Sequence, residues 1–203
     1  MKKVLSIFLA TIMLLSMSVT AFAAEPTIEK QINNLANEYG FETFDLDSRK
    51  VETVLEFDSI EEFEEFIRVI KQPQTFDIAI DTSKNSQTRD LNDNHVISWW
   101  SPFTGWGMTG IACWRNIAFD YSYKFVNGAP QFTNVSNIDS YLTGINVTFW
   151  DQKAASYNIV TEVTTKDKAE INVKGNYVLG VALEGFNIGL TIPGEWDGSL
   201  RLY

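Results

Sequence analysis

Cysteine and histidine are almost absent from this chain. Cys113 is the only cysteine and His95 the only histidine among 203 residues. One cysteine excludes an intramolecular disulfide, and in its strand-like stretch the thiol is expected to be buried and unreactive. The sequence has one histidine and contains no Gly-x-Ser-x-Gly, His-Glu-x-x-His or Cys-x-x-Cys motif. It therefore lacks the residues that common hydrolase and transition-metal sites need. We therefore expect no catalytic residues and a protein that is not an enzyme.

Basic residues are outnumbered by acidic ones. The chain has 16 Lys and Arg against 26 Asp and Glu, which gives a formal net charge of −10. Residues 25–94 carry most of the excess, with 17 acids against 7 bases. Such a surface repels phosphate backbones and anionic lipid headgroups, which excludes nucleic acid as a partner. Cationic partners or divalent cations are favoured instead.

The one long hydrophobic run lies at the amino terminus. Lys2 and Lys3 precede an apolar stretch over residues 4–17, and Ala21-Phe22-Ala23 places small residues at the two positions that a signal peptidase reads. The stretch is shorter than the roughly 18 to 20 residues that span a bilayer. Residues 1–23 are predicted to be a signal peptide cleaved near Ala23, so the mature protein is expected to be secreted and extracellular. A retained membrane anchor is the competing interpretation.

Residues 24–82 read as an acidic α/β segment with the order helix, strand, helix. Apolar residues recur at helical spacing over 28–39, and apolar and polar residues alternate over 51–57. Ser59 and Glu62 then form the capping-box pattern that begins a second amphipathic helix. Its glutamates have an ordinary interpretation as a solvated helix face.

Residues 83–94 are polar and predict a linker. Asp90, Asn92 and Asn94 place side-chain oxygens at alternate positions, as the opening of a calcium loop does. His95 stands where an EF-hand needs glycine, so an EF-hand is excluded. A looser Ca²⁺ site on these three residues is the weak metal candidate, and no other cofactor is expected. The linker is the preferred interpretation.

Period-two alternation dominates residues 95–203. The longest stretch covers 111–126 and is followed by Asn127-Gly128, the pair that favours a type I′ hairpin turn. Shorter alternating runs follow about every ten residues. They predict an antiparallel β-sandwich or open barrel, so the expected fold class is α+β, with the short acidic helix-strand-helix segment first.

Glycine recurs through the last third of the chain. Some of these glycines are expected in turns, and others at flat places where an aromatic ring approaches the backbone. Turns are predicted at Gly175-Asn176, Glu184-Gly185 and Pro193-Gly194.

Tryptophan and phenylalanine crowd into one short glycine-interrupted segment. The aromatic content of the chain is 13%, and Trp99, Trp100, Phe103 and Trp106 lie within eight residues. Outside the cell such a cluster can stack on sugar rings, which makes these four the candidate ligand-binding residues. The alternative is that they plug one end of the sandwich.

The expected function is that of an exported, non-enzymatic protein with an extracellular interaction surface. Its partner would be a cell-surface component, a glycan or a protein. A secreted membrane-active toxin or antimicrobial protein is the alternative, in which hairpins such as residues 169–192 rearrange into a bilayer. An extracellular hydrolase is the third possibility, and it requires His95 or two carboxylates in one cleft.

Overall fold

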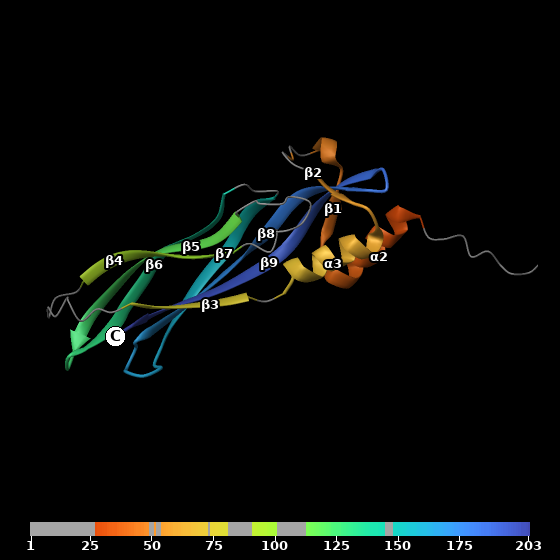
Figure 1. The fold of residues 1–203 in the computed structure, drawn as a ribbon. Helices are drawn as coiled ribbons and strands as arrows, with labels where there is room; N and C mark the ends of the chain where they lie inside the picture. Colours follow the sequence, from red (N-terminus) through yellow and green to blue (C-terminus); the bar gives the residue numbers. More distant parts are fainter. Residues whose placement is uncertain are drawn as a thin grey trace, which may run out of the picture.

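A computed structural model describes residues 27–48, 51, 54–72, 74–80, 91–100, 113–144 and 148–203 (Figure 1). The predicted signal peptide, residues 1–23, lies outside the described residues. Within these ranges the chain is mostly antiparallel β structure with two short helices. The helical elements are α2 (Ile28–Tyr39), α3 (Ile60–Ile70) and the 3₁₀ turn η1 (Leu46–Ser48). The strands are β1 (Glu42–Phe44), β2 (Val54–Phe57), β3 (Gln74–Ile80), β4 (Leu91–Trp100), β5 (Cys113–Val126), β6 (Ala129–Gly144), β7 (Phe149–Val160), β8 (Lys168–Leu183) and β9 (Phe186–Leu202).

A long hairpin of β8 and β9 forms the centre of the larger sheet, sheet A. The two strands pair antiparallel from Lys168↔Arg201 to Leu183↔Phe186. Glu184 and Gly185 join them with positive φ angles, which confirms the turn predicted there. At one end β1 and β2 flank the hairpin, and at the other end β3 and β7 do. The result is a curled half-barrel rather than one layer of a sandwich. The expected α+β fold, with an antiparallel sandwich or open barrel, is therefore correct in part: the described chain is mostly antiparallel β structure with two short helices, and not a clear α+β sandwich.

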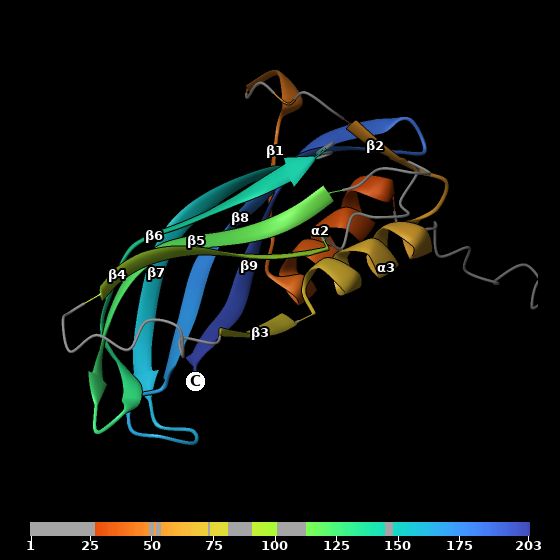
Figure 2. The same cartoon turned by 60° about the vertical axis from the view of Figure 1, so that its left-hand side comes forward.

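The acidic segment is built into this sheet. Its strands β2 and β3 pair parallel with β8 and β9, and β1 pairs antiparallel with β9. Both helices lie side by side at the β1 and β2 end (Figures 1 and 2). The Oγ atom of Ser59 accepts a hydrogen bond from the Glu62 N–H at 3.2 Å, which confirms the predicted helix start. The apolar stripe of α3 is buried, and burial of each of its side chains contributes about 1.5 to 3 kcal/mol. The stripe comprises Phe63, Phe66, Ile67 and Ile70.

The smaller sheet, sheet B, has the order β4-β5-β6 and is separate. Asn127 and Gly128 join β5 to β6 with φ angles of 53° and 82°, as the hairpin turn predicts. The odd-numbered residues of β5 from Cys113 to Tyr123 are buried. Cys113 is one of them and is 1% exposed, so the expected burial of its thiol is confirmed.

The linker predicted at 83–94 is wrong for its last four residues, which begin β4 and pair with β5. Cross-strand bonds satisfy their polar groups: Ser122 Oγ donates to Asn92 Oδ1 at 2.7 Å, and the Tyr121 hydroxyl donates to Asp93 Oδ2 at 3.2 Å. Bonds of this kind to the next strand let a mostly polar segment continue an edge strand. Leu91 also packs against the core. Residues 83–90 lie outside the described residues.

Two predicted turns, at Gly175 and at Pro193-Gly194, are also wrong, because both glycines lie inside continuous strands. A Cβ atom on Gly175 would stand 2.6 Å from the Trp150 ring, and one on Gly194 would stand 2.8 Å from the Tyr177 ring. Aromatic packing therefore requires these glycines, which is the role expected for other glycines of this stretch and not for these two. Pro193 fits because it falls between the stretches of β9 that pair with β1 and with β3.

The connection from β7 to β8 is organised around the carboxylate of Asp167. Its oxygens accept hydrogen bonds from the backbone N–H groups of Glu162 at 2.7 Å, Val163 at 2.9 Å and Thr164 at 2.9 Å. The residue is 1% exposed. Burial alone would raise the pKa of this carboxyl, but the backbone donors outweigh burial and lower it. This charge fixes the turn that brings β7 beside β8.

We predict that Asp167→Ala lowers the free energy of unfolding by about 2 to 3 kcal/mol at pH 7, because three N–H groups lose a charged acceptor. The pKa is lower in the folded state, so the stabilisation is complete above about pH 4 and is lost as pH falls through the folded value. Urea denaturation at pH 7 and pH 3 measures both effects. Asp45→Ala, which removes an exposed carboxylate bonded to the Asp47 N–H, is the matched control; equal losses in the two variants would contradict the prediction.

Candidate functional site

Four strands lie side by side in the half of sheet A that is farther from the helices. Their order is β3, β9, β8, β7. Residues that are partners in a register project from the same face of a sheet, so the pairing defines rows of side chains across it. Two neighbouring rows consist entirely of polar residues. One is Asp77–Ser199–Glu170–Asn158, and the other is Thr75–Asp197–Asn172–Ser156.

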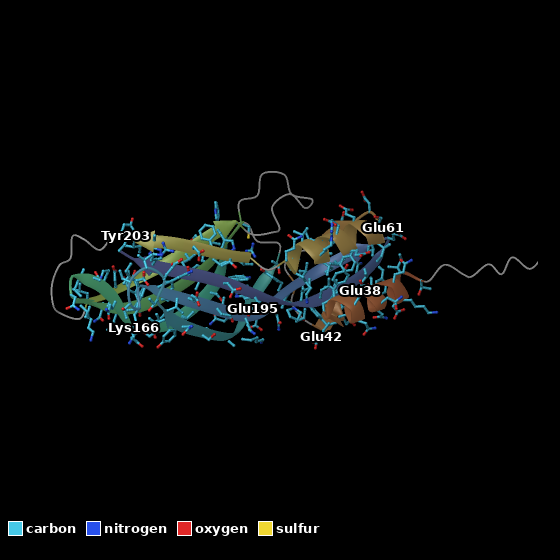
Figure 3. All side chains as sticks on the ribbon, turned by 90° about the horizontal axis from the view of Figure 1, so that it is seen from below. Glu38, Glu42, Glu61, Lys166, Glu195 and Tyr203 are labelled. Atoms are coloured by element: carbon cyan, nitrogen blue, oxygen red, sulfur yellow. The ribbon has the colours of Figure 1, made fainter. Side chains whose placement is uncertain are left out.

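Two further pairs that contain charged side chains flank these two rows. The pair Lys168↔Arg201 stands on one side, and the pair Lys174↔Glu195 on the other. Figure 3 shows Glu195 near the middle of the molecule's length, with the helical glutamates Glu38 and Glu61 toward one end. The two rows lie in a depression with a volume of about 360 Å³. We call it the groove; residues of both polar rows line it together with Tyr157, Lys168, Ile171 and Gly198.

Lys168 organises the negative charge at one end of the groove. Its Nζ atom lies 3.9 Å from a carboxylate oxygen of each of Asp77, Glu162 and Glu170, and its side chain is only 16% exposed. Arg201 Nε donates to Glu162 Oε2 at 2.6 Å. Individually, such long contacts at a surface contribute little. Together they hold one ammonium group among three carboxylates.

Asn172 organises the other end. Its amide nitrogen donates to Glu195 Oε1 at 2.6 Å and to Asp197 Oδ1 at 2.7 Å, so a neutral group holds two carboxylates close together. Lys174 Nζ lies 3.4 Å from Glu195 Oε1. The floor of the groove thus presents fixed hydroxyl, amide and carboxylate groups on paired strands, which suits a ligand rich in hydrogen-bonding groups.

Sequence reasoning missed this groove. The alternating polar residues of β8 marked one solvent-facing side of a strand, which is the ordinary property of an antiparallel sheet. The residues that complete the rows at the two sides come from β3 and β7. Asp77 of β3 and Glu170 of β8, which share one row, are 93 positions apart in the sequence. Only the pairing register shows that their side chains share a face.

Trp99, one of the four sequence-predicted ligand-binding residues, lies in the core. It is 6% exposed, stacks on Phe76 with ring centroids 5.7 Å apart, and meets Trp196 edge-on at 5.8 Å. The Arg115 guanidinium lies 5.5 Å from the centre of its ring. Trp99 therefore joins the sheets, as the plug interpretation predicts, and offers no exposed ring. The side chain of Trp100 is outside the described residues, as are Phe103 and Trp106.

Two of the three weak calcium candidates lie in a strand rather than in a loop. Asn92 and Asn94 belong to β4, an extended strand, and Asp90 lies outside the described residues. Within the described ranges there is no group of three or more His, Cys, Asp and Glu residues arranged to hold a metal ion. His95 is also in β4, and it lines no part of the groove.

Comparison of the chain with protein-family models, curated proteins and solved structures gave no match. In the part of the chain that the structure describes, neither helix has the length and apolar character needed to cross a membrane.

The burial of Trp99 gives a direct test of its role. We predict that Trp99→Ala lowers the free energy of unfolding by about 3 to 5 kcal/mol, because it empties a buried aromatic site. Phe149→Ala is the control, since that ring is 67% exposed, and the expected loss is below about 1 kcal/mol. Chemical denaturation of both variants measures the difference. Similar small losses would place Trp99 at the surface.

The single histidine predicts a pH dependence of stability. His95 is half-buried beside the ring of Phe119, and its Nε2 atom is buried without a hydrogen-bond partner in the described part of the chain. Burial lowers its pKa, and the charge of Asp93 only partly opposes this. The unfolded chain therefore takes up the proton first, and stability is lost as pH falls below about 6.5 until the folded pKa is passed.

An NMR titration of the His95 ring should give a pKa below about 6.5. The drop in unfolding free energy over this pH range should be absent from His95→Gln. A ring pKa at or above the ordinary value would show that the pocket around His95 is open to water.

Proposed function

We propose that this protein is an exported, non-catalytic binding protein that holds a carbohydrate in the groove of sheet A. The observation that carries the proposal is the double row of eight polar side chains on four paired strands. Sugars offer many hydroxyl groups, each a donor and an acceptor, and such a floor supplies both kinds of partner. The hydrogen-bonding groups of the floor stand on a rigid sheet, so little ordering is needed on binding.

A carbohydrate on a cell surface is the partner that fits the remaining properties. The formal net charge of −10 disfavours nucleic acid and anionic lipid. The expected signal peptide would deliver the protein to such a partner. An open groove with exposed polar walls is suited to one part of a longer chain passing through it, rather than to a small molecule enclosed on all sides.

A hydrolase is the second candidate, because the groove brings carboxylates together. Asp77 and Glu170 each place an oxygen 3.9 Å from the same Lys168 Nζ atom. Glycoside cleavage uses two carboxylates about 5 to 9.5 Å apart. Binding is favoured over cleavage because Lys168 pairs with both carboxylates and the Ser199 hydroxyl donates to Asp77, which ties both groups to the fold.

A membrane-active role is less favoured by the packing. The hairpin of residues 169–192, which would have to rearrange, is the centre of sheet A and carries much of the buried core. Releasing it would expose a row of buried side chains and break the pairing of four flanking strands.

The groove proposal is tested by the matched pair Asn158→Ala and Asn187→Ala. Both residues are exposed asparagines on strands of sheet A, but only Asn158 lines the groove. Oligosaccharide binding, screened on a glycan array and quantified by calorimetry, should weaken about tenfold in Asn158→Ala, because one ligand hydrogen bond is lost. Asn187→Ala should bind like the parent protein.

Equal binding by the two variants would place any carbohydrate site elsewhere. Release of new reducing ends from a bound oligosaccharide, abolished in Glu170→Gln, would instead favour the hydrolase. The expected result under the binding proposal is that bound oligosaccharide is recovered intact.

A further inference from the structure

We propose that the groove selects a carbohydrate that carries ammonium groups, which is an amino sugar in its unacetylated form. This inference rests on the proposed function and names the class of ligand for the same groove. It depends on how the charges along the groove are distributed among the described residues.

The lining of the groove is negative. Asp77, Glu170 and Asp197 line it, against Lys168 as the one basic residue among its lining residues in the described part of the chain. Lys168 already lies beside Asp77 and Glu170 and is shared with Glu162. Its positive charge is therefore concentrated at one end of the groove, and it leaves the other end with excess negative charge.

Asp197 lies at that other end. It is half-buried on the floor, and none of the ion pairs among the described residues includes it. Its hydrogen-bond donor is the neutral amide of Asn172, at 2.7 Å. The same amide nitrogen holds Glu195 at 2.6 Å, so a second carboxylate stands beside the first. Lys174 is near Glu195, but both of these side chains are half exposed to water.

Two neighbouring carboxylates held by an uncharged group favour a ligand that itself carries a positive charge. An ammonium group supplies that charge and three hydrogen-bond donors. Thr75 and Asn172 flank Asp197 in its row, and Ser199 and Glu170 stand in the next row. A sugar whose ammonium group meets Asp197 would therefore have acceptors around the charge and polar partners for its neighbouring hydroxyl groups.

A metal ion is the competing cation, and the geometry does not favour it. Within the described ranges no three metal-ligating side chains gather at one point. The carboxylates along the groove are instead spaced over two rows and tied to Lys168 and Asn172. An ammonium group needs one anion and a few acceptors, whereas Ca²⁺ takes six to eight oxygen ligands.

The test compares oligomers of glucosamine and of N-acetylglucosamine of equal length, with the full chain and calorimetry at low and high salt. The amine oligomer is expected to bind about tenfold more tightly at low salt, and the difference should shrink at high salt because exposed charges are screened. Asp197→Asn should remove this preference while it keeps binding of the acetylated oligomer. Asp47→Asn, which removes one exposed charge outside the groove, should leave the preference unchanged.

Each outcome separates the two proposals. Equal binding of both oligomers, or a preference that persists in Asp197→Asn, overturns the ammonium inference and leaves carbohydrate binding standing. Binding that requires added Ca²⁺ also overturns it. Binding of neither oligomer overturns the ammonium inference, and the glycan array with the Asn158→Ala and Asn187→Ala pair then decides the proposed function separately.

Discussion

The structure of sheet A depends on the stacking of Trp150 of β7 on Trp196 of β9, across strand β8. The ring centroids are 4.0 Å apart and the planes differ by 17°. In this arrangement the aromatic rings lie directly against the strand backbone. Gly175 and Gly194 make this possible, because they have no side chains where the rings lie. The hairpin can therefore remain continuous beneath its aromatic layer. The four flanking strands of sheet A pair with β8 or β9 and depend on that continuity.

The same aromatic layer joins the two sheets. The Trp150 indole N–H donates to Ser140 Oγ of sheet B at 2.8 Å, and the Trp196 indole N–H donates to the Tyr177 hydroxyl at 2.7 Å. Each ring thus buries a large apolar surface and still satisfies its one polar atom. Arg115 extends the layer, because it is 2% exposed and lies over Trp99. Burial lowers the pKa of this guanidinium, and its hydrogen bond to Tyr177 opposes that effect.

A rigid interior gives the outer face of the sheet its potential as a binding surface. The residues of β8 alternate between the core, where Ile171 and Val173 are buried, and the groove, where Glu170 and Asn172 stand. The groove residues of β8 cannot move without movement of its core residues, which are closely packed. The polar groups of the groove are therefore held in fixed positions by packing on the opposite face. Such preorganisation limits the entropy that a ligand must offset when it binds.

The sequence by itself determined the local features of the chain. Helical periodicity and the Ser59 cap located α3, alternation located β5, and Asn127-Gly128 located its hairpin, because these signals act between residues that are close in sequence. Tertiary structure alone decided that Gly175 lies within a strand, since the reason is the ring of Trp150, 25 residues away. It also decided the groove, whose rows join β3 to the three last strands, β7, β8 and β9. Pairing register sets which polar residues become neighbours, and register depends on packing of the whole sheet rather than on any local pattern.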